Sequence, residues 1–511
     1  MKPFQILREI ISVSFATVSG GMPGIDILLL VTGVLVFAGL LAVGILSKGE
    51  GEKIAFRRAL FAALVFPLPF ALLGLLNFPG QVIAGWILLG LFWGTLLLLI
   101  LPIRIVAAPR DGAPKSRFDE RDTIFSRAYL EEDSVRFHEY YERRPQNLEA
   151  DKHFRREPGL LSLQSREADS LAFAAVEAGF FTEEHLRFIT DGAVSPERIR
   201  VEPEEITEYI RGLSRYLGAH SVGFTLLRPE HLYTTGGRRE WYGKPVKNDH
   251  KYAIAFTVEM NYRMTRQGPK PGTVMETARQ YLRAGEIAVQ IAEFIRRLGY
   301  SARAHISSHY EVICPLVARE AGLGEIGRMG LLMTPRLGPR VRLSVVTTEL
   351  PLVAEPRSFD GTVIEFCEIC EKCAAVCPSQ SIPRGQRREE NGVLRWRIDA
   401  ESCYTYWCKA GTDCSRCMGV CPYSHPDTPL HSLVRLLVKH AGVFRRVAPL
   451  LDDLLYGKRP KPLEPMDWQR SSKMNKQEYL PPVPSKHPGS VDLSGEVVSR
   501  IVDQEDLDLP S

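Results

Sequence analysis

The stretch FCEICEKCAAVCPSQSI, Phe366–Ile382, places four of the chain's ten cysteines within eleven residues. Nine of the ten cysteines lie between Cys367 and Cys421. The disulfides of a secreted framework would be spread along the chain, whereas a tight cluster in one segment is typical of metal binding. We therefore expect these thiols to hold metal on the reducing side of a membrane.

The first cysteine run reads C-x2-C-x2-C-x3-C-P, the spacing of bacterial ferredoxins that carry [4Fe–4S] clusters. In that pattern the fourth cysteine ligates the other cluster of the pair. A second run, C-x2-C-x3-C-P, follows, and either Cys403 or Cys408 upstream can complete it. The predicted ligands are Cys367, Cys370, Cys373 and Cys421 for cluster 1, and Cys377, Cys403, Cys414 and Cys417 for cluster 2, with Cys408 as the alternative. A pair of zinc sites is the alternative to two iron–sulfur clusters, but the proline after each cysteine run disfavours it.

Composition restricts the class of protein. The chain has 511 residues, room for two to four domains, and a net charge of only +4. This balance gives no reason to expect a nucleic-acid partner.

Three apolar stretches, at about 25–46, 59–78 and 82–103, each have roughly the 20 residues that cross a bilayer. We predict a transmembrane anchor over 24–105, preceded by an interfacial segment over 1–23. One side of the predicted anchor carries Lys48, Lys53, Arg57, Arg58, Arg104, Arg110, Lys115 and Arg117, and the other only Lys2 and Arg8. Loops rich in Lys and Arg that flank transmembrane segments usually stay on the cytoplasmic side. We therefore expect a multi-pass inner-membrane protein whose large domain faces the cytoplasm.

The remaining chain predicts an α+β fold. Residues 106–200 are charged and are expected to form a linker that covers the surface, while 201–355 form a more regular domain. Lys251–Met260 and Val341–Leu350 read as strands. Between them, Ile287, Ile291 and Ile295 lie on one face of a predicted helix that ends near Gly299. Residues 426–511 are expected to be an irregular C-terminal extension.

AGLGEIGRMG, Ala321–Gly330, has four glycines within nine residues, which lets the backbone approach another group closely. It lacks the GK[ST] of a Walker motif and does not match a dinucleotide fingerprint.

Taken together, QYLRA…AEFIRRLGY, the glycine segment continued as GLLMTPRLGPRVRL, TTELPL and the two cysteine runs resemble the reductive dehalogenases from about Glu202 to Ser424. The resemblance implies a nitroreductase-like α/β corrinoid-binding core at 201–355 and a ferredoxin-like domain with two [4Fe–4S] clusters at 356–425. It also implies a cobamide bound base-off, and the chain has no DxHxxG motif to supply a lower cobalt ligand.

The resemblance assigns roles to individual residues. Tyr281 takes the position of the proton donor and Arg342 that of its basic partner. A nearby cation lowers the pKa of a phenol and improves it as an acid. The residues expected to contact the cofactor are Gly322, Gly324, Gly327, Arg328, Gly330, Ser307 and Ser308. The implied partners are an organohalide substrate, the membrane and an unidentified low-potential electron donor.

Two departures from the family pattern bear on function. Many respiratory members place an asparagine near the substrate, where this chain has SARAHISSHYEVICP, with Ser307, Ser308 or His309 in that region. Respiratory members are usually exported by a twin-arginine signal, whereas this chain is expected to carry its own anchor, as in a membrane-fused branch. Two rival functions are an epoxyqueuosine-reductase-like enzyme acting on tRNA and a membrane electron-transfer protein without a catalytic site.

Overall fold

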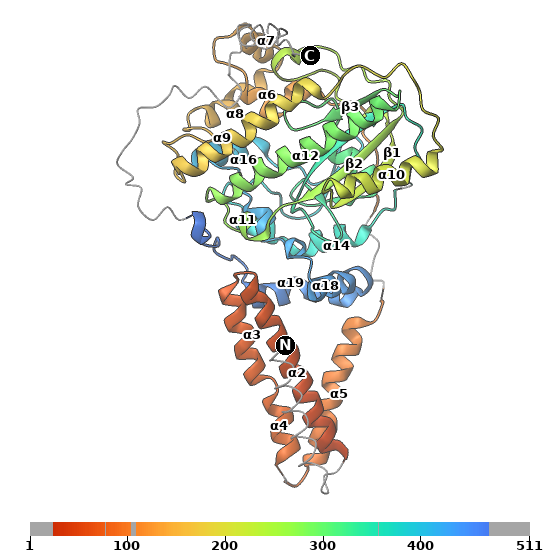
Figure 1. The fold of residues 1–511 in the computed structure, drawn as a ribbon. Coiled ribbons are helices and arrows are strands. Elements are labelled where there is room, and N and C mark those ends of the chain that lie inside the picture. Colours follow the sequence, from red (N-terminus) through yellow and green to blue (C-terminus); the bar gives the residue numbers. More distant parts are fainter. Residues whose placement is uncertain (1–23, 77, 104–108, 356, 470–511) are drawn as a thin grey trace, which may run out of the picture.

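The computed structural model describes residues 24–76, 78–103, 109–355 and 357–469. Apolar helices form one end of the molecule, and an α/β core forms the other (Figure 1). Two C-terminal helices, α18 (Pro429–His440) and α19 (Gly442–Tyr456), lie between these two parts.

A four-stranded antiparallel sheet organises the core, in the order β1-β2-β6-β3. Its strands are β1 (Ser221–Leu226), β2 (Tyr252–Glu259), β3 (Ala302–His305) and β6 (Val341–Thr348). The predicted strands at 251–260 and 341–350 are thus confirmed. β2 is mostly apolar because both faces of the sheet are covered. Ile254 and Phe256 belong to the core on one face, and Ala253 and Ala255 to the core on the other.

The long helix α12 (Gly272–Arg297) covers the first face of the sheet. Ile287, Ile291 and Ile295 are at most 1% exposed, which confirms the predicted core face. Gly299 follows with φ +83°, the left-handed conformation that glycine adopts at helix ends. α10 (Pro203–Tyr216) packs on the same side, and α13 (Cys314–Glu320) covers the second face.

Three segments are long and apolar enough to cross a membrane: Gly24–Gly49, Lys53–Leu75 and Gln81–Ile100. They comprise α2 (Gly24–Gly49), α3 (Lys53–Val65), α4 (Leu68–Leu75) and α5 (Gln81–Ile100). The second segment is divided because Pro67 lies between α3 and α4. Many large apolar side chains on these helices point outward, Phe61 being 68% exposed. The predicted interfacial segment 1–23 lies outside the described residues.

The prediction of a linker over 106–200 is wrong for the described part of that range. It forms η1 (Glu120–Asp122), α6 (Ile124–Ala128), α7 (Val135–Arg143), α8 (Pro145–Arg155), α9 (Ser170–His185) and η2 (Leu186–Ile189). Phe173 and Val176 of α9 pack against α12 with at most 2% exposure. The charge of this region misled the prediction, because buried ion pairs such as Arg127–Asp151 hold it in place.

The cysteine-rich region is built from short elements. They are α14 (Gly361–Cys370), α15 (Lys372–Val376), α16 (Ala400–Ala410), α17 (Arg416–Gly419) and the hairpin of β7 (Arg388–Glu390) and β8 (Val393–Arg395). A second hairpin, β4 (Glu325–Ile326) with β5 (Leu332–Met333), carries the glycine segment. The described elements are completed by the short helix α11 (Tyr262–Thr265) and by the 3-10 turns η3 (Pro229–His231), η4 (Arg239–Trp241), η5 (Pro422–Ser424) and η6 (Asp467–Gln469).

The C-terminal extension is not irregular where the structure describes it. α18 begins after Thr428, whose hydroxyl accepts a hydrogen bond from the backbone N–H of His431, and Pro429 occupies its first turn. This start signal was present in the sequence, but the surrounding prolines obscured it. Val438 and Phe444 join the core around the cysteines.

Candidate functional site

The structure brings the eight predicted ligand thiols together in two groups of four. Burial raises the pKa of the Cys421 thiol, and Cys367, Cys370 and Cys373 raise it further. All four side chains therefore lie close enough to interact, as cluster 1 requires. All ten cysteines are free of disulfides.

The second group resolves a choice that the sequence left open. Burial raises the pKa of Cys403 to about 12, and interactions with Cys417 and Cys377 raise it further. Cys414 in turn interacts with Cys417 and Cys403. Cys408, by contrast, packs in a small apolar cluster with Phe154 and Tyr404. The structure thus places Cys403, rather than Cys408, with the second group.

The chemistry of these thiols fits iron–sulfur clusters. Burial favours the protonated thiol, and it raises the pKa of Cys370 and Cys417 to about 12. Two sets of four such groups are stable as thiolates when a metal supplies the compensating charge. Cys373 also interacts with Cys417, so the two groups are neighbours.

Tyr281 and Arg342 meet at the edge of the core. Tyr281 lies on α12, Arg342 lies on β6 opposite Val258, and the Arg342 guanidinium carbon is 4.8 Å from the centre of the Tyr281 ring. The contact is with the face of the ring. The ring of Phe180, on α9, lies 6.5 Å from that of Tyr281. The helix and strand predicted from the sequence therefore place the two side chains together.

Asp413 connects this pair to the second cysteine group. Arg342 donates hydrogen bonds to Asp413 (3.2 Å) and to Thr277 (2.8 Å), and Thr277 donates to the same Asp413 oxygen. Burial raises the pKa of Asp413, whereas Arg342 lowers it. Asp413 directly precedes Cys414. Sequence reasoning missed it, although it stands next to the first cysteine of the second run.

Several buried polar atoms around this junction lack a hydrogen-bond partner among the described residues. They are Arg342 Nε, Asp413 Oδ1, Thr273 Oγ1 and Gln267 Oε1. Thr273 lies in the first turn of α12 and Gln267 lies in the loop before it. Thr412 donates a hydrogen bond to the Pro269 carbonyl across the same junction. Buried polar atoms are normally satisfied. Their concentration here favours a polar ligand between α12 and the second cysteine run.

The glycine segment packs closely against its own chain. A Cβ at Gly324 would lie 2.2 Å from the Met333 carbonyl oxygen, and one at Gly327 would lie 2.6 Å from the Met333 side chain. The space beside Gly322 is open, and Gly330 has only ordinary contacts with Ile398. Contact between these glycines and a cofactor stays a prediction, since packing alone explains two of them.

Arg328, in the same segment, is 1% exposed and supports the first cysteine run. It donates hydrogen bonds to the carbonyls of Cys367 (2.9 Å), Pro383 and Gly385, and its guanidinium lies over Trp396. Its predicted role in cofactor binding is untested; its observed contacts hold the cluster 1 loop.

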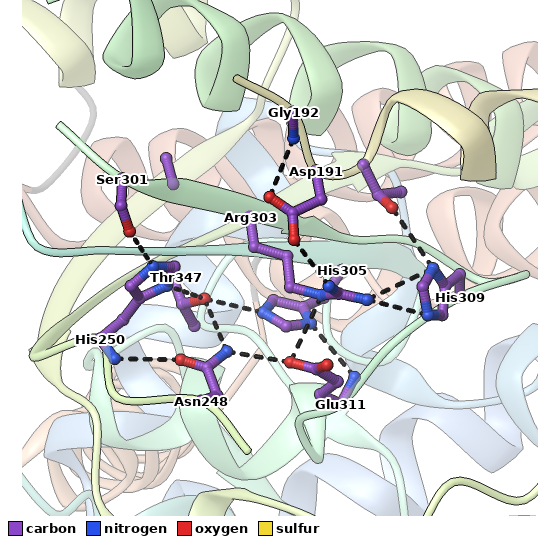
Figure 2. Close-up of polar contacts among 12 residues, drawn as sticks. Asp191, Gly192, Asn248, His250, Ser301, Arg303, His305, His309, Glu311 and Thr347 are labelled. Atoms are coloured by element: carbon purple, nitrogen blue, oxygen red, sulfur yellow. Dashed lines mark hydrogen bonds and ion pairs between the residues drawn. The ribbon is translucent and has the colours of Figure 1, made fainter. Parts of the chain in front are cut away.

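The loop after β3 carries Ser307, Ser308 and His309, and a buried polar network positions it (Figure 2). His305 Nδ1 accepts from the backbone N–H of Glu311, so its Nε2–H donates to Thr347 at 2.9 Å. Arg303 donates to His309 Nε2 at 2.9 Å. Burial lowers the pKa of His309 to about 3, with Arg303 lowering it further. His309 is therefore neutral at pH 7.

The two serines of this loop contact protein groups. Ser308 donates from its backbone and its hydroxyl to Glu183 of α9, each at 3.2 Å, and the Ser307 carbonyl accepts from Arg238. A cofactor contact for either serine stays a prediction. Sequence reasoning missed Arg238 and Glu183, which belong to the region that it had interpreted as a linker or left unassigned.

A cavity of about 300 Å³ opens beside this loop. Its lining is rich in cations, namely Arg187, Arg238, Arg239, Lys244, Lys247 and Arg303, with Glu120, Glu240 and Glu311 among them. The Trp241 and His309 rings stack at 4.7 Å to form one wall. Tyr310 lines the cavity and interacts electrostatically with Tyr281, so the cavity lies on the Tyr281 side of the core.

Comparison with known proteins agrees with this geometry. The family model described as a 4Fe-4S dicluster domain matches residues 366–425. The tetrachloroethene reductive dehalogenase of Sulfurospirillum multivorans is 30% identical over 292 residues, which cover 50% of this chain and 58% of that protein. A tetrachloroethene reductive dehalogenase of Desulfitobacterium hafniense is 31% identical over 301 residues, covering 49% and 52%. The chain thus spans less than two thirds of these relatives.

Solved structures give the same relationship. The catabolic reductive dehalogenase NpRdhA in complex with 3-bromo-4-hydroxybenzoic acid has a TM-score of 0.57 at 27% identity, covering 70% of this chain and 49% of that one. A second reductive dehalogenase structure, which suggests a mechanism for B12-dependent dehalogenation, matches with the same TM-score, identity and coverage. Over about half of its length the chain is similar to the reductive dehalogenases, and its cysteine-rich region matches a 4Fe-4S dicluster domain.

Proposed function

We propose that this protein is a membrane-anchored, corrinoid-dependent reductive dehalogenase that converts R–X, two electrons and a proton into R–H and a halide ion. The observation that carries the proposal is the continuous contact from Tyr281 through Arg342 to Asp413, the residue directly before Cys414. The proposed proton donor and a proposed ligand of cluster 2 are therefore linked through this junction.

A corrinoid fits that junction. The unpartnered buried atoms of Arg342, Asp413, Thr273 and Gln267 are suited to a ligand with many polar side groups. When bound, a corrinoid would supply a strongly reducing cobalt for cleavage of the carbon–halogen bond. The similar reductive dehalogenase structure that suggests a mechanism for B12-dependent dehalogenation supports this proposal.

We assign distinct roles to the residues of the junction. Tyr281 donates the proton to the carbon that loses the halide. Arg342 lies against the ring and stabilises negative charge as it develops on the phenol oxygen. Asp413 and Thr277 hold the Arg342 guanidinium in place, so they are positioning residues.

The arrangement of the two cysteine groups suggests the direction of electron flow. Lys372, between Cys370 and Cys373, pairs with Asp452 and Asp453 of α19, which lies beside the apolar helices. Cys414 of the second group directly follows Asp413, and Asp413 pairs with Arg342, which contacts the Tyr281 ring. Electrons would therefore enter at cluster 1, on the membrane side, and leave from cluster 2 toward the corrinoid. The electron donor is unidentified.

The lining of the cavity suggests a class of substrate. Six cationic side chains face three carboxylates, and Trp241 offers an aromatic surface. An aromatic organohalide that bears a phenolate or carboxylate suits this lining better than a neutral one. NpRdhA, the related dehalogenase, is recorded with 3-bromo-4-hydroxybenzoic acid.

The anchor is proposed to place the catalytic domain in the cytoplasm. Basic residues flank the apolar segments on the side of the large domain, and the loop between α2 and α3 packs against that domain through Glu52 and Arg266. A multi-pass arrangement in the inner membrane follows. The nitroreductase-like character of the core remains a prediction.

The proposal is tested by anaerobic reconstitution of the full chain in detergent with iron, sulfide and a cobamide, followed by halide detection. We expect about eight iron atoms and one corrinoid per chain, and faster halide release from 3-bromo-4-hydroxybenzoate than from bromobenzene. A Lys244→Ala/Lys247→Ala variant should raise the KM for the anionic substrate, whereas Lys251→Ala, outside the cavity, should not. Eight iron atoms with no corrinoid bound would instead support a simple electron-transfer protein.

A further inference from the structure

A buried cluster of histidine and carboxylate side chains lies where the apolar helices meet the cysteine-rich domain. Glu50 comes from the loop between α2 and α3, while His425 and His431 come from the other end of the chain. One ligand atom from each lies within 4.8 Å of the others. All three residues are at most 8% exposed.

The distances within this cluster suit a metal ion. Glu50 Oε2 is buried without a hydrogen-bond partner among the described residues, and it points toward His425 Nδ1 at 3.7 Å. Two ligands at about 2.1 Å from a tetrahedral zinc ion lie roughly 3.4 Å apart. His431 Nε2 lies 2.6 Å from Glu50 Oε1 and needs only a small movement to become the third ligand.

The surroundings of His425 match those of a metal-bound imidazole. Its other nitrogen, Nε2, donates to Asp452 at 3.2 Å, and Asp452 pairs with Lys372. A carboxylate on the far nitrogen is the usual device that orients a metal-binding histidine and makes it more basic. The Tyr262 hydroxyl lies 3.3 Å from His425 Nδ1, beside the place that a fourth ligand of a tetrahedral ion would occupy.

We propose that Glu50, His425 and His431 bind one divalent transition-metal ion of the zinc class, which clamps the loop between α2 and α3 to the segment after Cys421. Imidazole and carboxylate ligands are those that zinc accepts. His425 lies four residues after Cys421, and α18 carries His431 (Figure 1). The ion therefore joins the anchor to the part of the chain that holds cluster 1, whatever reaction the core performs.

The first test counts metals in the full chain, reconstituted anaerobically with iron and sulfide in detergent and then dialysed against one equivalent of zinc. We expect about eight iron atoms and one zinc per chain. Glu50→Ala and His431→Ala should keep eight iron atoms and lose the zinc. The matched control is His440→Ala, an exposed histidine on the same helix, which should keep both.

Zinc should also raise the thermal unfolding midpoint of the wild type and of His440→Ala, but not of His431→Ala. Unchanged zinc in Glu50→Ala and His431→Ala, or no zinc in wild-type chains with eight iron atoms, would overturn the proposal. X-ray absorption at the zinc edge of the wild type decides the case even if a variant misfolds. A shell of nitrogen and oxygen near 2.0 Å supports the site, and sulfur near 2.3 Å contradicts it.

Discussion

Replacing Cys403 and Cys408 separately tests how the chain assembles cluster 2. The two cysteines are five residues apart on α16, yet only Cys403 lies close enough to Cys417 and Cys377 to interact with them. Cys408 is 4% exposed and packs on Phe154 and Tyr404. Replacing Cys403 should therefore remove a cluster ligand, whereas replacing Cys408 should remove only an apolar contact.

The expected magnitudes follow from these environments. Cys403→Ala should lower the iron content from about eight to about four atoms per chain, because a [4Fe–4S] cluster needs four ligands. The visible absorption and the reduced-state electron paramagnetic resonance signal should fall by about half. Cys408→Ala should keep about eight iron atoms and cost roughly 1 kcal/mol of stability, the usual loss for one buried heavy atom.

The assay is iron and sulfide determination after anaerobic reconstitution, with the wild type prepared in parallel. Thermal unfolding of each variant shows whether the chain is folded when its iron is counted. Full iron content in Cys403→Ala together with a loss in Cys408→Ala would refute the assignment of the two cysteines.

Three further predictions concern the buried polar groups. Asp413→Ala leaves Arg342 without its carboxylate partner, so it should lower the free energy of unfolding by about 3–5 kcal/mol in a denaturant titration. The control is Arg297→Ala, which breaks an exposed pair with Glu293 on α12 and should cost about 0.3–0.5 kcal/mol in the same titration. Burial lowers the pKa of His309 to about 3 and that of His231 to about 4, so both are neutral in the fold and the stability that they contribute is lost as pH falls from about 6.5 toward those values. The unfolding midpoint should drop over that interval, with His309→Gln reducing the slope by about 1.4 kcal/mol per pH unit and His440→Gln leaving it unchanged. Glu183→Gln should preserve the fold but slow halide release, since the contact of Glu183 with Ser308 positions the loop beside the cavity. Equal rates for the variant and the wild type would show that this loop is not part of the active site.

The elements that depend on local pattern could be predicted from the sequence. The strands β2 and β6 and the helix α12 carry regular apolar periodicity, and the cysteine spacing identifies the metal-binding region. The contact of Tyr281 with Arg342 was predicted through family resemblance, because nothing local in the chain links a tyrosine on α12 to an arginine about sixty residues later.

Other features depend on tertiary contacts that a single sequence does not reveal. The helices of 106–200 are charged, and their stability comes from buried ion pairs such as Arg127 with Asp151. The choice of Cys403 over Cys408 depends on which side of α16 faces the second cysteine run. Asp413, Glu50 and His431 gain their surroundings only when distant segments meet.

The most direct test of the central claim is the halide release rate of Tyr281→Phe, measured in chains matched for iron and corrinoid content. General acid catalysis contributes about 100- to 10,000-fold, so we predict a loss of that size with the cofactor spectra unchanged. Tyr209→Phe, an exposed tyrosine on α10, is the control and should retain the wild-type rate. Halide release by Tyr281→Phe within about threefold of the wild type would contradict the account.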